Sequence, residues 1–437
     1  MSLFATFEGK WFLPEKEDNC ITGKLTITED SDIKLELNGL LFDEKSPEFK
    51  EAKCILGRTS QGEFITLIDC TQIGVQHTSF ASKSTFFCYT FIKGEFCKDD
   101  LPKFKKAYIR SNFLNEFLDK RIFQSSLKNQ EERSIEITTF EKEIFEHPDF
   151  KILLRTYPSC SFSSNLYELK RNSNIIINFT DDVKEEIFTK NSEHLIKFFS
   201  ILSNKKLSAQ GINFYTTDPY SELLFLSLRN RFLNSTIDSK EKYLLQFGEI
   251  EDDIANILTQ WYSNIDKNNI LSILLIDSFT DSEGFLEDKF LSLCKFLELF
   301  HKMYRNSEIN QNKNKLFEEA IEDCRVSNKK ALEAILKEKI HPSFKERLDK
   351  LFEEAEPLPL LKIYLPSKSD SIRRISKSRN QYTHYHEDSS ELILKGQDLL
   401  HYTKSLRVLC TFLLLKEVGV PEIKLYKFIS GRKYIFN

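Results

Sequence analysis

The sequence predicts an α+β protein in which a β-rich, sandwich-like N-terminal region precedes an all-α helical bundle. Up to about residue 240, apolar side chains alternate with polar ones, which is the two-residue period of half-buried strands. From there onward they recur every three or four residues, as on the buried face of a helix. The 437 residues suffice for separate cores, so we expect domains at 1–240 and 241–437.

Turn residues separate the strands expected in the first region. Lys24–Thr28 and Ile33–Leu37 are expected to form a hairpin, and Cys54–Leu56 and Phe64–Ile68 a second one. The remaining expected elements are strands at Phe86–Ile92, Ile175–Phe179 and Ile212–Tyr215, a helix at Glu193–Leu202 begun by Ser192, and an exposed loop at Thr71–Ser82 that could recognise a ligand.

Helix-like periodicity marks the second region. The predicted helices cover Ile250–Trp261, Leu286–Phe300, Leu316–Leu336, a segment opened by Ser343–Glu346 and ending before Pro357, and Leu399–Leu413. Ser343 and Glu346 have the spacing of a capping box, and Gly419 with Pro421 is a stop signal for the last helix. These segments indicate a bundle.

The composition of the chain limits the classes of protein to which it can belong. A net charge of −4 excludes a chain coated in basic surface, so any contact with nucleic acid should be local. Nine cysteines without a C-x-x-C spacing favour reduced thiols, and thus a cytoplasmic protein, over disulfides or zinc. The apolar run Val408–Leu415 is too short to cross a bilayer, and the first residues do not resemble a signal peptide, so we expect no membrane association.

The hexapeptide Arg379–His384 is the strongest functional signal. It joins a permanent cation to the side chain that exchanges protons near neutral pH, and cleavage of a phosphodiester needs both. Four Arg-Asn pairs occur, and chance would place a histidine at the fifth residue after one of those arginines with a probability of ~0.07. Arg379, Asn380 and His384 are therefore candidate catalytic residues.

The hexapeptide lies in a locally basic stretch, residues 367–388, whose candidate phosphate-binding residues are Arg373, Arg374 and Lys377. On an ideal helix Asn380 and His384 share a face, but Arg379 and His384 are five residues apart. Those two would converge at a helix end, across a π-bulge, or through the reach of the arginine. His386 could play a supporting role.

This chain resembles the HEPN superfamily of helical ribonucleases, whose mark is an arginine followed after four to six residues by a histidine, often with asparagine next to the arginine. Arg379, Asn380 and His384 match that mark. A β-rich first half before such a domain is similar to the ApeA-like anti-phage defence proteins. The likeness of the first half depends on Gly9-Lys10-Trp11 and the hairpin pattern.

The resemblance implies an endoribonuclease that acts in abortive infection without a metal or other cofactor. Two copies of the motif would face each other, so at least a homodimer is implied. His384 would assist proton transfer as the RNA 2′-OH attacks the phosphate, Arg379 would stabilise the developing charge, and Asn380 would orient these groups or the RNA. The first half would sense a trigger, which could be phage-derived.

Two alternatives stay open at this point. Pro148-Asp149 followed by Glu168-Leu169-Lys170 imitates the carboxylate pattern of metal-dependent nucleases, which would place a Mg²⁺ site in the first half. The chain could also be a non-catalytic HEPN module that binds RNA or a nucleotide, with the first half as a scaffold.

Overall fold

The computed structural model divides the chain into two compact units, formed by residues 1–199, 206–242 and 246–255 and by residues 200–205, 243–245 and 256–437. The structure describes residues 5–14, 16–28, 32–42, 50–77, 81–97, 103–110, 113–127, 133–163, 166–207, 211–215, 222–227, 244–279, 284–305, 319, 321–322, 342–356, 367–384 and 391–431.

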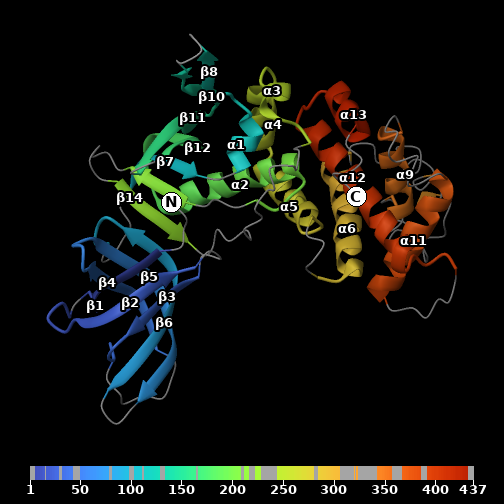
Figure 1. Cartoon of the computed structure of the whole chain (residues 1–437). Coiled ribbons are helices and arrows are strands. Elements are labelled where there is room, and N and C mark those ends of the chain that lie inside the picture. Colours follow the sequence, from blue (N-terminus) through green and yellow to red (C-terminus); the bar gives the residue numbers. More distant parts are fainter. Residues whose placement is uncertain are drawn as a thin grey trace. The chain divides into compact units, whose positions relative to one another are not determined.

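The first unit begins with six strands that close into a barrel (Figure 1). These strands are β1 (Ala5–Phe12), β2 (Ile21–Ile27), β3 (Ile33–Leu37), β4 (Glu51–Thr59), β5 (Phe64–His77) and β6 (Ser82–Lys93). Neighbours around the barrel follow the order β6-β3-β2-β1-β4-β5, and β5 pairs again with β6. All of these pairings are antiparallel.

Alternating side chains produce the barrel core. On β3 the apolar residues Ile33, Leu35 and Leu37 are buried and the charged residues between them are exposed, as the two-residue period requires. Trp11 is fully buried and lies against Gly57, where a Cβ atom would come within 2.3 Å of the indole ring. Glycine is therefore needed at position 57 for the tryptophan to fit.

A second antiparallel sheet continues from β6. Its strands are β14 (Glu222–Ser227), β13 (Gly211–Tyr215), β7 (Phe104–Arg110), β12 (Leu166–Val183), β11 (Phe150–Ser163) and β10 (Phe140–Glu146), in that spatial order. One edge of β6 is shared, because Ser84–Cys88 pair with β3 while Thr90–Lys93 pair with β14. A separate two-stranded sheet joins β8 (Phe123–Leu127) to β9 (Arg133–Ile137).

Three helices accompany these sheets: α1 (Phe113–Leu118), α2 (Glu185–Ser203) and α3 (Phe247–Ile250). Aromatic rings pack them together within the first unit. Phe117 of α1 makes an edge contact with Phe199 of α2, with 5.1 Å between ring centroids. Phe188 of α2 makes another with Phe179 of β12, at 6.4 Å.

Helix α6 (Leu286–Tyr304) is central to the second unit, where it contacts α5, α9, α11 and α12. The other described helices are α4 (Ile254–Ser263), α5 (Ile265–Ile276), α9 (Phe344–Glu354), α11 (Lys368–His384), α12 (Gly396–Glu417) and α13 (Glu422–Gly431). Phe290, Leu293, Leu297 and Phe300 of α6 are fully buried, which is the spacing that predicted this helix.

The predicted fold class is confirmed: a strand-rich first region is followed by a helical second region. Both predicted hairpins exist as β2–β3 and β4–β5. Ser343 caps α9 in a capping box with Glu346, as predicted. The predicted helix at Leu316–Leu336 lies almost entirely outside the described residues.

Three local predictions were wrong. Thr71–His77 is strand instead of loop, because β5 continues to His77, and β6 begins at Ser82; residues 78–80 lie outside the described part of the chain. Ser192 lies inside α2, which starts at Glu185, and the serine hydroxyl donates to the Thr189 carbonyl instead of capping the helix. The helix predicted at Ile250–Trp261 is interrupted by a turn at 251–253, which separates α3 from α4.

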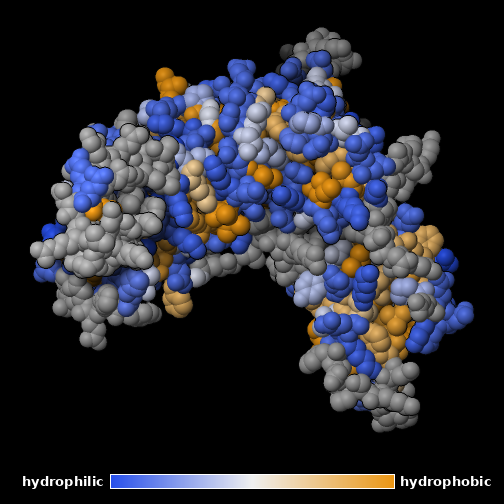
Figure 2. All heavy atoms as spheres, turned by 180° about the vertical axis from the view of Figure 1, so that it is seen from behind, coloured by the Kyte–Doolittle hydropathy of each residue, from blue (hydrophilic) through white to orange (hydrophobic). Residues whose placement is uncertain are grey.

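On the face shown in Figure 2, hydrophilic side chains predominate and hydrophobic areas interrupt them. Large hydrophobic residues exposed on the described part of the chain include Ile73 and Val75 of β5 and Phe285 before α6. Among the described helices, none combines the length and the hydropathy that a bilayer crossing requires.

Candidate functional site on helix α11

Helix α11 carries the whole motif and separates a buried face from an exposed one. Ser371, Ile372, Ile375 and Ser378 are buried. Arg373, Lys377, Asn380 and His384 are exposed, and their spacing of four, three and four residues places them on one face of the helix. We call these four residues the α11 stripe. Two cations, an amide and an imidazole are thus presented together to solvent.

Arg379 lies beside this stripe and is held in place by three groups. Its Nη2 donates to Oε2 of Glu298 on α6 at 3.1 Å, and its Nη1 donates to Oδ1 of Asn380 at 3.2 Å. The guanidinium also lies over the ring of Phe344 at 5.5 Å, in cation–π contact. The side chain stays 27% exposed, so a ligand can still reach it.

His384 is the last residue of α11, which is α-helical along its whole length. The helix has no π-bulge between Arg379 and His384, and His384 stands at its end. In the final turn the Thr383 hydroxyl donates to the Arg379 carbonyl at 2.7 Å, the bond to residue i−4 that threonine side chains form within helices. His386 lies outside the described residues.

The C-terminal half of α11 is fixed from its buried side. The Ser378 hydroxyl accepts a hydrogen bond from the Leu394 amide at 2.8 Å, and the Tyr382 hydroxyl donates to the Leu394 carbonyl. The Tyr382 ring also meets Phe290 of α6 edge to face, with 6.1 Å between centroids. These contacts set the rotation of α11 about its axis, and thus the direction in which the stripe points.

The basic residues of this stretch differ in their contacts. Arg374 donates to Asp398 at 2.6 Å and lies over the ring of Tyr402, so its charge is engaged within the chain. Lys368 forms ion pairs with Asp349 and Glu353 on α9. Arg373 and Lys377 are exposed members of the α11 stripe. Arg373 and Lys377 are therefore more accessible to a phosphate than Arg374, which is only partly exposed.

Glu298 and Phe344 are the members of this site that the sequence analysis missed. Glu298 precedes Arg379 by 81 residues and belongs to a different helix. Its neighbour Cys294, one turn earlier on α6, is buried, and burial raises the pKa of its thiol although the charge of Arg379 opposes the shift. No local sequence pattern marks Glu298, because its pairing depends on the packing of α6 against α11.

The carboxylates of the metal-nuclease alternative do not come together. Asp149 lies between β10 and β11, and its carbonyl accepts from the Thr180 amide near the end of β12. Glu168 lies near the start of β12, opposite Ser161, so about 12 strand residues, or roughly 40 Å of extended chain, separate the two positions. Among the residues that the structure describes, no three His, Cys, Asp or Glu side chains gather as metal ligands would.

Comparison with known families now identifies the two regions. The model of ApeA N-terminal domain 1 matches residues 6–261, which is more than half of the chain, and the model of Apea-like HEPN matches residues 291–424. Searches of curated proteins and of solved structures gave no significant match. The HEPN match includes Glu298, Arg379, Asn380 and His384. The resemblance inferred from the motif is thus confirmed, and the chain belongs to the ApeA family of HEPN-type anti-phage defence proteins.

Proposed function

We propose that this protein is a metal-independent endoribonuclease whose cleavage of RNA serves anti-phage defence by abortive infection. The observation that supports this proposal is the position of Arg379. Glu298 and Asn380 hold its side chain beside the exposed face of α11, and His384 lies on that face. A fixed cation and a solvent-accessible imidazole on the same helical segment supply the groups for phosphate binding and for proton transfer. The protein acts in the cytoplasm, where RNA is available.

In the proposed reaction the 2′-oxygen of the RNA bonds to the adjacent phosphorus while the bond from phosphorus to the 5′-oxygen breaks. One histidine accepts the proton of the 2′-OH, and a second, protonated histidine donates a proton to the departing 5′-oxygen. The products are a 2′,3′-cyclic phosphate and a 5′-OH. Arg379 contacts the phosphate and stabilises the negative charge that increases in the transition state.

Two proton-transfer groups are needed, and the α11 stripe offers one histidine per chain. We therefore place the active site between two chains, so that His384 of one protomer and His384 of its partner serve as base and acid. Asn380 orients Arg379, to which it is already hydrogen-bonded. Arg373 and Lys377 extend the cationic surface along α11 and hold the flanking phosphates.

The decisive experiment compares RNA cleavage by the wild type, Arg379→Ala and His384→Ala in the presence of EDTA, with detection of cyclic phosphate ends. Arg155→Ala and His401→Ala serve as matched controls, because both side chains are exposed and lie outside the stripe. Loss of cleavage in the first two variants alone supports the assignment. Activity that survives in either of them, or that disappears with EDTA, contradicts it.

A mixing experiment tests the shared site. Because the proposed site needs His384 from both chains, a mixed dimer of one wild-type chain and one His384→Ala chain keeps both arginines but only one of the two histidines. Loss of cleavage by a dimer shown to be mixed supports a site between chains, and retention of about half of the wild-type activity counts against it. If the wild type itself cleaves no RNA but binds it through Arg379, the protein is an RNA-binding HEPN module.

A further inference from the structure

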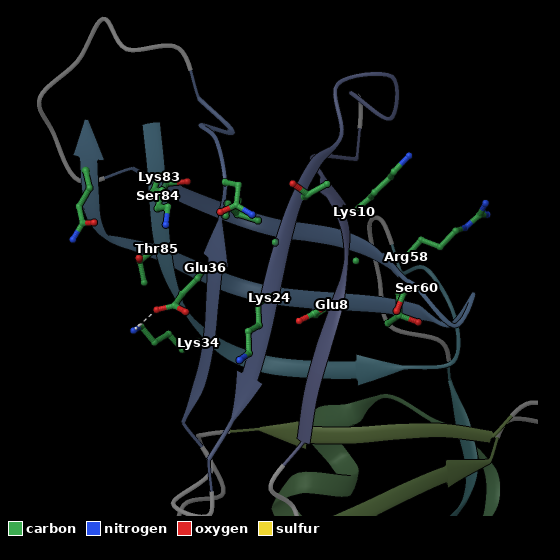
Figure 3. Close-up of a pocket in the computed structure, with 17 residues that line it drawn as sticks. Glu8, Lys10, Lys24, Lys34, Glu36, Arg58, Ser60, Lys83, Ser84 and Thr85 are labelled. Carbon is green, nitrogen blue, oxygen red and sulfur yellow. Dashed lines mark hydrogen bonds and ion pairs between the residues drawn. The ribbon is translucent and has the colours of Figure 1, made fainter. Parts of the chain in front are cut away.

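The barrel of the first unit carries a hollow of about 990 Å³ on its polar face (Figure 3). The lining comes from β1 to β6 and includes five cationic side chains, Lys10, Lys24, Lys34, Arg58 and Lys83. Two carboxylates, Glu8 and Glu36, belong to the same lining. In a chain of net charge −4, this surface thus gathers five positive side chains against two negative ones.

From these residues we infer that the hollow binds the phosphodiester backbone of a nucleic acid. The inference goes beyond the proposed RNA cleavage and does not depend on it, because binding here needs neither Arg379 nor His384. It assigns a ligand class to the barrel, the phosphodiester chains of nucleic acids. It also assigns a mode of recognition, in which the protein contacts phosphates without reading bases.

Strand register provides the first argument. Lys10 and Arg58 are direct cross-strand partners, and Figure 3 shows both projecting from neighbouring strands β1 and β4. Like charges in this arrangement destabilise a sheet. Neither residue has an ion-pair partner among the described residues, although Arg58 lies over the ring of Phe64 at 5.0 Å. A bound phosphate would remove the repulsion that the fold leaves uncompensated.

The neighbouring row of side chains provides a second argument for the same inference. Lys24 stands opposite both Glu8 and Glu36 in register. Glu36 forms its 2.7 Å ion pair with Lys34, and this hydrogen bond, with the charges of Lys24 and Lys83, lowers its pKa. Lys24 and Lys83 form no ion pair within the described part of the chain. They remain available to an external anion.

Glycines make this surface possible. Gly9 and Gly23 are cross-strand partners within the lining, and a Cβ atom would come within 2.4 Å of the Arg58 carbonyl oxygen at Gly9 and 2.5 Å of the Glu36 carbonyl oxygen at Gly23. No larger residue allows this approach of neighbouring strands. The Gly9-Lys10-Trp11 segment thus combines close strand packing, an outward cation and a buried core residue.

The chemistry of the lining favours nucleic acid over a protein partner. Besides the five cations, the two carboxylates and two glycines, its polar members are Ser, Thr, Asn and Gln side chains, the types that contact phosphates and sugars. Its single large apolar residue, Leu37, is buried, so the hollow lacks the apolar centre of a protein interface. It also has no aromatic ring on which a base could stack, so binding should be independent of sequence.

The test measures binding of a fluorescent single-stranded 2′-O-methyl RNA, which lacks the nucleophilic hydroxyl, by anisotropy at several salt concentrations. We expect the double variant Lys10→Gln, Arg58→Gln to bind about tenfold more weakly and to flatten the slope of log K against log salt by about 1.4, the value for two lost phosphate contacts on a single strand. Lys24→Gln should weaken binding independently.

The matched control is Lys16→Gln, Lys53→Gln, which removes the same charge from exposed lysines outside the hollow. Equal effects on RNA and on DNA of the same sequence support backbone recognition, and an effect on one of them identifies the source of the phosphates. The inference fails if the double variant binds like the control, or if polyglutamate competes as well as nucleic acid at equal charge. Circular dichroism verifies that each variant is folded.

Discussion

Glu298 and Arg379 form an ion pair of 3.1 Å that joins α6 to α11 at the proposed active site. Both side chains are more than a quarter exposed, so the pair adds little to stability, about 0–1 kcal/mol for a surface ion pair. Its effect is directional, because it fixes where the guanidinium points. Glu298 therefore belongs to the proposed active site, although the sequence motif does not include it.

Glu298→Gln should reduce cleavage by up to about a hundredfold while the melting temperature changes little, because misplacement of a positioned group by about 1 Å costs on that order. Initial rates of RNA cleavage and thermal unfolding measure the two effects. Asp288→Asn, an exposed acid on the same helix, is the matched control. A large loss of stability, or a rate equal to that of the control, would show that Glu298 does not position Arg379.

Arg305→Ala should lower the free energy of unfolding of the helical unit by about 2–3 kcal/mol, between the values for exposed and for buried pairs. Arg305 donates two hydrogen bonds to Glu354 and one, at 2.8 Å, to Glu417, and so links the end of α6 to α9 and α12. Thermal or urea unfolding measures the change. Lys302→Ala, on the exposed side of the same turn, should have a far smaller effect.

His301→Phe should make stability less dependent on pH. Burial lowers the pKa of His301 below its ordinary value of 6.5, the charges of Arg347 and Lys350 add to this shift, and Glu354 opposes it. The imidazole is 2% exposed, and neither nitrogen has a hydrogen-bond partner among the described residues.

Proton linkage determines whether the free energy of unfolding rises or falls with pH. Below about pH 6.5 the unfolded chain takes up a proton that folded His301 resists, so the wild type loses stability as the pH falls toward the folded pKa. Urea unfolding at pH 7.5 and at pH 5.5 should show this loss in the wild type and in the control His401→Phe, and a smaller one in His301→Phe. Equal losses in all three proteins would exclude His301 as the cause.

Gly57→Ala should destabilise the barrel by about 1–3 kcal/mol, the usual cost of overpacking, because its methyl group would overlap the Trp11 ring. Gly74→Ala is the control, since no atom lies within 4 Å of the added Cβ atom and the backbone at this position is not left-handed. Tryptophan fluorescence during urea unfolding compares the two. Similar midpoints would contradict the tight contact between Trp11 and residue 57.

The sequence predicted those elements whose cause is local. The β2–β3 hairpin follows from alternation around a short turn, and α9 follows from the capping box of Ser343. The motif residues also stand together on one short segment. In contrast, the partnership of Glu298 with Arg379 requires α6 to pack on α11. The cross-strand pair of Lys10 with Arg58, and the neighbouring row that contains Lys24, require the register of three strands. Such relationships depend on tertiary packing, which periodicity does not encode.

The position of strand β6 between two sheets determines how the first unit unfolds. One edge of β6 completes the barrel through β3 and continues into the second sheet through β14, so the two sheets are hydrogen-bonded to successive parts of the same strand. A fragment that ended at Lys93 would keep the six barrel strands but would expose the part of β6 from Thr90 onward that β14 covers. Melting of either sheet therefore frays the other, and the two should denature as a single cooperative block.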